Sequence, residues 1–328
     1  MSTKKLFGKS VGLIMLCLSL NLFFNGLVSA AEEYPTRPIK LIIPFSPGGV
    51  ADIIWRAMVD PMGKVLGQPV VIENKPGGAG SLGYTMVASS KPDGYTVGHI
   101  SLGSFINNYF IYDVSYNPTK SFTIIGGVAR YAEALVVKAD APWKTWDEFI
   151  DYSKKNPNEI KIGFSGAAST GTIGMKWISK KLGIKWKEVT FPGDAEGITA
   201  LLGGHIDAFP GAGAQNIQVR DGRARMLLAV TVDPIPGFPD VPTFKKLYGK
   251  DTMNGCALIG PAGIPEPVLT KLEKAVHEGT KDPGSLKAMN QMNTTPLWRN
   301  SKTMTQDVNA AFISFRELLE DLDMVKKK

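Results

Sequence analysis

The chain has 328 residues and a formal net charge of +7, from 37 lysines and arginines against 30 aspartates and glutamates. So mild a basic excess, without a cluster of basic residues, argues against nucleic-acid binding. The length suits one large or two modest domains with an ample core.

The first thirty residues resemble a secretory signal peptide. Three lysines precede an apolar run from Val11 to Phe24, and Val28-Ser29-Ala30 offers a cleavage site of small residues. A single membrane anchor is the alternative, but the run is short for a membrane span. Cleavage after Ala30 would remove three lysines and no acid, which lowers the charge to +4. It would also remove Cys17 and leave only Cys256, which we interpret as a core residue, so no intrachain disulfide is expected.

Beyond the leader, β-rich runs alternate with helical patterns. The predicted strands are Ile39–Pro44, Val70–Glu73, Tyr95–Ile100, Leu135–Lys138, Ile160–Phe164, Glu188–Phe191, Ala208–Phe209 and Met226–Thr231. The predicted helices include Ala51–Leu66, Ser81–Ser89, one capped by Thr145 with Glu148 at its third position, one from Asp194 to Leu202, Glu266–Lys281 and Thr305–Val325. The βαβαβ order at the start predicts an α/β fold with a parallel sheet and helices on both of its faces.

The segment from Pro44 to Asp52 joins the first strand to the first helix through two prolines and two glycines. Such a turn directs several backbone N–H groups outward at the positive end of a helix, which forms an anion site without basic side chains. The N–H groups from Gly49 to Asp52 are expected to bind one carboxylate. The predicted ligand-binding residues of this loop are Phe45, Gly48, Gly49, Val50, Ala51 and Asp52.

The carboxylate of Asp52 cannot face a ligand carboxylate directly while both are ionised. Its sequence position allows two roles, a helix cap or the orientation of a water molecule that touches the ligand.

A second glycine-rich turn follows the second strand, from Pro76 to Gly83, and contains a literal G-x-G-x-x-G. Alone that pattern is weak, and the acidic residue that a dinucleotide site needs about twenty positions later is missing. We therefore expect an anion cradle for a small carboxylate, with a plain turn as the alternative. The predicted ligand-binding residues here are Gly78, Ala79 and Gly80.

Three further segments are expected to face the ligand. Ser101 and Ser104 follow the third predicted strand, and a hydroxyl-rich loop before a helix suits a second carboxylate or a polar ligand tail. Asp194 either caps its helix or accepts a hydrogen bond from a ligand N–H or O–H. Phe45, Phe105 and Phe191 either wall the pocket or belong to the core. The remaining predicted site residues are Ser165, Ser169, Thr170, Thr172, Phe191 and Asp194.

These loops contain no lysine or arginine. A trianion such as citrate normally requires cationic neutralisation, so the pattern favours a mono- or dicarboxylate. The three histidines are scattered, no nucleophile elbow is present, and no group has metal-ligand spacing. We expect no enzyme activity, no metal and no cofactor.

Several motifs in order carry a family resemblance. They are Tyr34-Pro35-Thr36-Arg37-Pro38-Ile39, Pro44-Phe45-Ser46-Pro47-Gly48-Gly49 with Asp52, Gly67-Gln68-Pro69-Val70-Val71, Glu73-Asn74-Lys75-Pro76-Gly77, Pro92-Asp93-Gly94-Tyr95-Thr96, Leu201-Leu202-Gly203-Gly204-His205-Ile206-Asp207 and Gly260-Pro261-Ala262-Gly263-Ile264-Pro265. The chain resembles the solute-binding proteins of the tripartite tricarboxylate transporter group, the Bug or TctC family. The resemblance spans the whole chain after the leader.

The resemblance implies a two-domain periplasmic-binding-protein fold of the Venus-flytrap kind (type 2-like), with doubly wound sheets and two interdomain crossings. Domain one would be residues 31–133 plus 255–328, and domain two 134–254. A monomer in the periplasm would close on a small carboxylate and deliver it to the large and small membrane subunits of a permease. The resemblance also favours the water-orienting role of Asp52. The alternative function is a receptor that signals ligand presence to a sensor kinase or another regulator.

Overall fold

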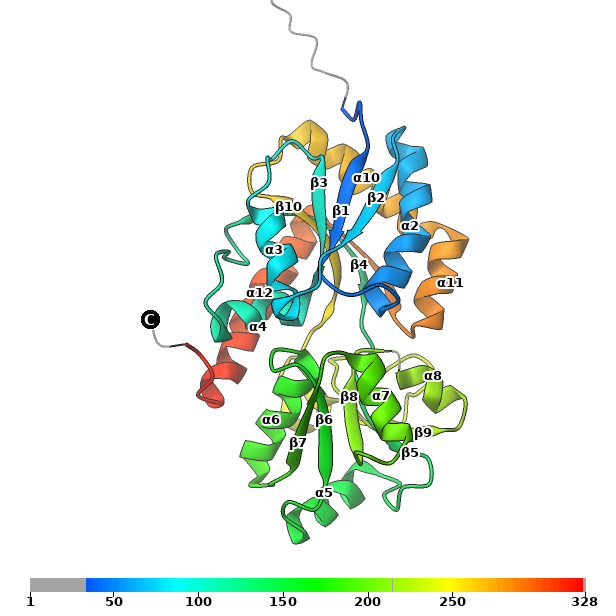
Figure 1. Ribbon diagram of the computed structural model, residues 1–328, viewed down its shortest axis with the longest axis vertical. Helices are drawn as coiled ribbons and strands as arrows, with labels where there is room; N and C mark the ends of the chain where they lie inside the picture. Colours follow the sequence, from blue (N-terminus) through cyan, green and yellow to red (C-terminus); the bar gives the residue numbers. More distant parts are fainter. Residues whose placement is uncertain (1–33, 214, 327–328) are drawn as a thin grey trace, which may run out of the picture. The chain divides into compact units, whose positions relative to one another are not determined.

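The computed structural model describes residues 34–213 and 215–326. From Arg37 onward these residues form one compact unit, which contains two β-sheets (Figure 1). The predicted signal peptide, residues 1–30, lies outside the described residues. Within the described part of the chain, no helix has both the length and the apolar character needed to cross a bilayer.

The first lobe is built on a six-stranded sheet with the order β11-β4-β10-β3-β1-β2. Its strands are β1 (Ile39–Ile43), β2 (Val70–Asn74), β3 (Thr96–Ser101), β4 (Phe122–Arg130), β10 (Gly255–Pro261) and β11 (Thr295–Asn300). Its helices are α2 (Val50–Leu66), the 3₁₀ turn η1 (Gly78–Gly80), α3 (Ser81–Ala88), α4 (Leu102–Ile111), α10 (Glu266–Lys281), α11 (Pro283–Gln291) and α12 (Ser301–Asp321).

The expected parallel sheet is present only at one side of this lobe. β1 pairs in parallel with β2 and β3, but β10 runs antiparallel to both β3 and β4, and β11 runs antiparallel to β4. The sheet is therefore mixed. The two antiparallel strands, β10 and β11, come from the part of the chain that follows the second lobe. β1 itself is apolar and buried at four of its five positions, and only Lys40 is exposed, as expected for a strand in the middle of a sheet covered by helices.

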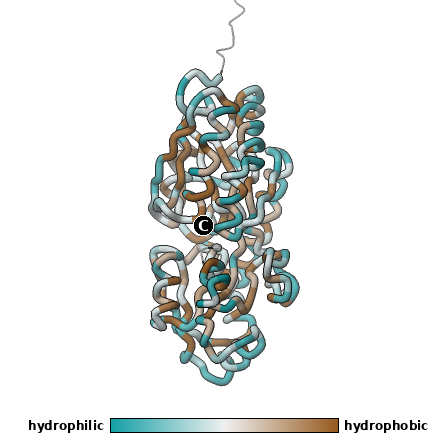
Figure 2. The backbone as a smooth tube through the Cα atoms, turned by 90° about the vertical axis from the view of Figure 1, so that its right-hand side faces the viewer, coloured by the Kyte–Doolittle hydropathy of each residue, from teal (hydrophilic) through white to brown (hydrophobic). Residues whose placement is uncertain are grey.

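Helices cover both faces of this sheet, as the sequence predicts (Figure 1). α2 packs with α10 and α11, while α4 packs with α12 and α3 lies against β3 and β10. Pro61 inside α2 cannot donate to the carbonyl of Ala57, and the hydroxyl of Ser285 in α11 donates to that carbonyl instead (3.2 Å). Figure 2 shows brown, hydrophobic stretches of backbone in the interior of both lobes and teal, hydrophilic stretches at many of the outer turns.

The second lobe is built on a five-stranded sheet with the order β7-β6-β8-β5-β9. Its strands are β5 (Ala134–Lys138), β6 (Lys161–Ser165), β7 (Lys187–Phe191), β8 (Ala208–Gly211) and β9 (Ala224–Ala229). Its helices are α5 (Trp146–Lys155), α6 (Thr170–Leu182), α7 (Asp194–Leu202), α8 (Gln215–Arg220) and α9 (Phe244–Tyr248). The hydroxyl of Thr145 accepts the N–H of Glu148 at the start of α5, which confirms the predicted cap.

The chain passes from one sheet to the other twice. Residues 131–133 join β4 to β5, and residues 249–254 lead from α9 to β10. The buried side chain of Asn254 contacts the first lobe, because its Oδ1 accepts the N–H of Gly103 in α4 (2.9 Å).

The turn after β1 and the start of α3 are in direct contact at Gly83. A Cβ placed on Gly83 would lie 2.6 Å from Cβ of Pro44 and 3.0 Å from its Cα, closer than real Cβ atoms pack. Only a glycine therefore lets α3 approach the end of β1, and this contact holds the two glycine-rich turns side by side.

We predict that Gly83→Val destabilises the fold by about 1–3 kcal/mol, because the added side chain overlaps the Pro44 ring. Urea unfolding measures the change, with Leu82→Met as a control at the half-exposed neighbouring position. An unfolding free energy equal to that of the wild type would show that α3 can shift without cost.

Candidate functional site

The first turn of α2 presents unpaired backbone donors at the end of the central strand β1. Gly49 is the N-cap residue and provides no side chain. None of the described residues accepts a hydrogen bond from the N–H groups of Gly49, Val50 or Ala51. Gly49 is exposed and Val50 is half-buried, so the positive end of a 17-residue helix is open to a ligand.

Asp52 is the third residue of α2, and the N-cap residue is Gly49, so the expectation that Asp52 is the N-cap residue is wrong. Its Oδ2 accepts the N–H of Gly48 (2.9 Å), one residue before the N-cap, and pairs with Nε of Arg56 (2.8 Å). Burial opposes ionisation of this carboxyl, but the hydrogen bonds from Arg56, Gly48 and Asn74 outweigh it and lower its pKa. The negative charge is thus balanced within the protein, and the helix end keeps its positive character.

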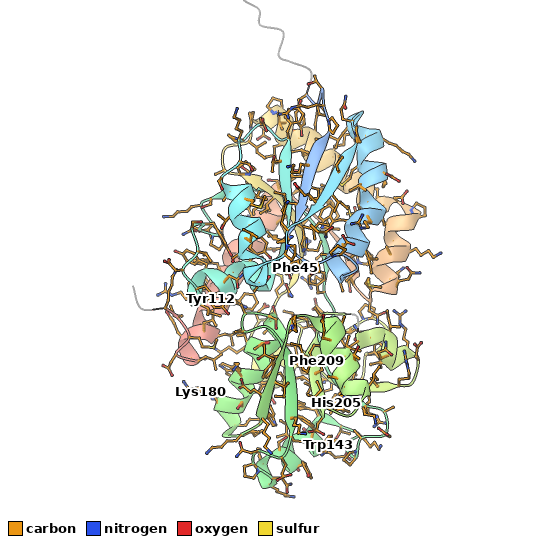
Figure 3. The ribbon with its side chains drawn as sticks, in the orientation of Figure 1. Phe45, Tyr112, Trp143, Lys180, His205 and Phe209 are labelled. Carbon is orange, nitrogen blue, oxygen red and sulfur yellow. The ribbon has the colours of Figure 1, made fainter. Side chains whose placement is uncertain are left out.

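Asn74 and Arg56 complete this corner, and sequence reasoning missed both. The amide Nδ2 of Asn74 lies 3.0 Å from both the carbonyl of Phe45 and Oδ1 of Asp52, while its Oδ1 accepts from Arg56 (3.2 Å). The signal was available, because a parallel β1–β2 pair places the last residue of β2 beside Ile43. Phe45 is half-buried, its ring lies edge-on to His99 at 5.9 Å, and Figure 3 labels it at the end of this lobe.

The second turn is left-handed. Gly77, Gly78, Ala79 and Gly80 have φ values of 145°, 53°, 53° and 97°, and Ala79 is the one member of this run with a side chain. Nδ2 of Asn108 donates to the carbonyl of Ala79 (2.9 Å), which fixes the turn and leaves the N–H groups of Gly78 and Ala79 without acceptors among the described residues. These donors belong to the same edge of the sheet as the α2 terminus.

The serines after β3 have different environments. Ser104 is buried and engaged, with its hydroxyl 3.0 Å from that of Tyr84 and donating to the carbonyl of Ser101. Ser101 is half-buried at the N-cap of α4, and its hydroxyl makes no capping bond. Phe105 is fully buried in the core, which confirms the core alternative for this residue over the pocket-wall alternative.

The hydroxyl-rich loop before α6 is used by the helix itself. Oγ of Ser169 accepts the N–H of Thr172 (3.2 Å), and Oγ1 of Thr172 donates to the carbonyl of Gly166 (2.8 Å). Thr170 and Thr172 are each 1% exposed. Nδ2 of Asn107 in the first lobe donates to the carbonyl of Ala168 (2.9 Å) and ties the two lobes together here. The hydroxyl groups of Ser169 and Thr172, expected to bind a second carboxylate or a polar ligand tail, are thus hydrogen-bonded within the loop and the helix start.

Glu133, which the sequence analysis missed, lies in the first crossing segment and reaches the start of α6. It is 2% exposed, and its Oε1 accepts the N–H of Gly171 (3.3 Å). Burial raises the pKa of this carboxyl from 4.5 to about 8, and the nearby charge of Asp194 acts in the same direction. No local sequence pattern indicates this contact, because only the fold brings residue 133 to this helix end.

Asp194 is the first residue of α7 and bridges to the next loop. The N-cap is Gly193 without a side-chain bond, so the predicted capping role is wrong. Oδ2 of Asp194 accepts the N–H of Ala212 after β8 (2.7 Å). Burial raises the pKa of this carboxyl above its usual value. Phe191 is half-buried against Phe209, with ring centroids 6.5 Å apart.

A surface cavity at the two crossing segments contains none of the predicted ligand-binding residues. It is lined by Arg130, Tyr131, Ala132, Thr231, Val232, Asp233, Pro234, Ile235, Pro236, Thr252, Met253, Asn254 and Thr295. The cavity therefore belongs to the connection between the sheets, where Arg130 pairs with Asp233. Cys256 is buried as expected, and the described residues hold no group of three or more potential metal ligands.

The fold and the site define a class of two-lobed solute-binding receptors. The profile of the tripartite tricarboxylate transporter family receptors, TctC, matches residues 54–323. A relative from Cupriavidus necator, "UPF0065 protein in gbd 5'region", is 32% identical over 297 residues and covers 90% of each chain. The chain belongs to the TctC receptor family, as its motifs indicate, and this is a family of receptors rather than enzymes.

Solved structures agree with this assignment. The periplasmic binding protein BugD superposes with a TM-score of 0.80 at 27% identity and covers 90% of this chain and 100% of its own. MatC from Rhodopseudomonas palustris, solved with bound malate, superposes with a TM-score of 0.78 at 25% identity and covers 87% and 100%. The predicted α/β fold of the periplasmic-binding-protein class is thereby confirmed.

The raised pKa of Glu133 predicts that the stability of the protein depends on pH. Its pKa is higher in the folded chain than in the unfolded chain, so the folded state binds the extra proton between pH 4.5 and about 8. Stability must therefore fall as pH rises through this window. Glu133→Gln should equal the wild type near pH 4.5 and exceed it by a few kcal/mol at pH 8, since one pKa unit corresponds to about 1.4 kcal/mol.

Urea unfolding at the two pH values measures this difference. Glu196→Gln, at an exposed position on α7, is the matched control and should leave the pH dependence unchanged. An equal fall in stability for the wild type and Glu133→Gln would contradict the assignment.

Proposed function

We propose that this protein is a periplasmic receptor that captures a small organic acid with one or two carboxylates. The open first turn of α2 carries the proposal, because unpaired N–H groups at a helix terminus bind a carboxylate without a cationic side chain. The donors of the Gly78–Gly80 turn and the hydroxyl of Ser101 lie at the same edge of the sheet and are available to the same ligand.

The relatives support this proposal. MatC was solved with malate, a small carboxylate, and BugD is described as a periplasmic binding protein. Residues 54–323 match a receptor family that is named for tripartite tricarboxylate transport. The receptor then delivers the ligand to the large and small membrane subunits of such a transporter. Export uses a signal peptide cleaved after Ala30.

The two sheets suit a hinged monomer. Residues 31–133 with 255–328 form the first domain, and residues 134–254 form the second. The crossing segments, 131–133 and 249–254, act as the hinge, and ligand held between the lobes favours the closed form. Asp52 stiffens the ligand loop and orients water at its edge.

A binding panel tests the proposal. In thermal-shift and calorimetric titrations at pH 7.5, mono- or dicarboxylates should stabilise the protein, because a ligand that binds only the folded state raises its stability. Citrate should bind weakly, because three charges exceed what backbone donors neutralise. Tight binding of citrate with no response to smaller acids would contradict the proposal.

Gly49→Val tests the location of the site. Gly49 has an ordinary extended conformation (φ −77°, ψ 171°), and an added Cβ has its nearest neighbour at 3.6 Å, so the fold accepts a side chain. We expect the dissociation constant for the best acid of the panel to rise at least tenfold, while the loss of a good N-cap residue costs only about 1 kcal/mol of stability. Gly49→Ala is the smaller matched variant. Unchanged affinity in folded Gly49→Val would place the ligand elsewhere.

A further inference from the structure

We infer that the second lobe excludes a second carboxylate and selects a ligand whose far end is uncharged or cationic and donates hydrogen bonds. This inference rests on the proposed function and narrows it to one class, monocarboxylates with a distal hydroxyl, amide or ammonium group. It follows from a contrast between the helix starts of the two lobes.

The α6 start is occupied by the protein's own groups. Oγ of Ser169 accepts a hydrogen bond from the N–H of Thr172, and the carboxyl of Glu133 accepts one from the N–H of Gly171. Glu133 and Thr170 are buried beside this helix terminus, at 2% and 1% exposure. A ligand carboxylate here would compete with Glu133 for the same donors and face its oxygens.

The α7 start carries two acids in its first turn, Asp194 and Glu196. The Asp194 carboxyl lies where β7 and β8 end, because α7 begins shortly after β7 and the carboxyl accepts the N–H of Ala212, the residue directly after β8. Neither Asp194 nor Glu133 forms an ion pair with a lysine or arginine of the described chain. The carboxylate of Asp194 and a ligand carboxylate would repel strongly in this partly buried site, so a second carboxylate at this position is disfavoured.

The helix start in the first lobe has the opposite character, and this difference decides the orientation of the ligand. Its acid, Asp52, is paired with Arg56 at 2.8 Å, and the N–H groups of Gly49, Val50 and Ala51 remain free. One lobe therefore offers donors, and the other offers an acceptor carboxyl without a counter-charge. A molecule with a carboxylate at one end and a hydrogen-bond donor at the other complements both.

Length-matched acids test the inference by calorimetry at pH 7.5. The two series are succinate with γ-hydroxybutyrate and γ-aminobutyrate, and adipate with ε-hydroxycaproate and ε-aminocaproate. In whichever series binds, we expect the hydroxy or amino acid to bind at least tenfold more tightly than the dicarboxylate. Asp194→Asn keeps an acceptor for the N–H of Ala212, and it should reduce that ratio at least tenfold.

Glu159→Gln is the control, because Glu159 is an exposed acid just before β6, at the end of that strand away from Asp194, and its ratio should equal that of the wild type. The wild-type panel stands by itself should Asp194→Asn fail to fold. A dicarboxylate that binds the wild type as tightly as its donor-ended partners overturns this inference and leaves the proposed function intact. Absence of binding by every acid overturns the proposed function and this inference with it.

Discussion

The unpaired N–H groups at the start of α2 are the feature on which the account depends. They exist because β1 ends at Ile43 and only six residues, Pro44 to Gly49, lead from it to the start of α2. Exposed donors cost little while water satisfies them, and a helix terminus stabilises an anion by about 0.3–1 kcal/mol, or up to about 2 kcal/mol when partly buried. The side chains of Asp52, Arg56 and Asn74 fix the conformation of this turn and leave the N–H groups of Gly49, Val50 and Ala51 free for a ligand.

The second lobe uses the same architecture for the opposite electrostatic result. Its helices α6 and α7 also begin at the carboxyl ends of strands, yet Glu133 and Asp194 place carboxyl groups at those starts. The interlobe bonds of Asn107 and Asn254 bring this acidic edge to the donor-rich edge of the first lobe. Ligand orientation is thus built into the difference between two similar βα units.

Much of this could be predicted from the sequence, where local chemistry dominates. The strand, glycine turn and helix start at residues 39–66 and the Thr145 cap follow from patterns within a few residues. Helix α4 was missed, because Phe105, Ile106 and Asn107 are poor helix formers and burial against α12 decides their structure. Contacts between distant residues, such as Glu133 with Gly171 and Asp194 with Ala212, leave no local pattern at all.

Backbone amide NMR tests the central claim most directly. In a titration of ¹⁵N-labelled protein with the acid that binds most tightly, the proton resonances of Gly49, Val50 and Ala51 should move downfield more than any other backbone amides, because these groups exchange water for a carboxylate. Resonances that stay in place at α2, with the largest shifts in arginine or lysine side chains or near the cavity at the crossing segments, would contradict the account.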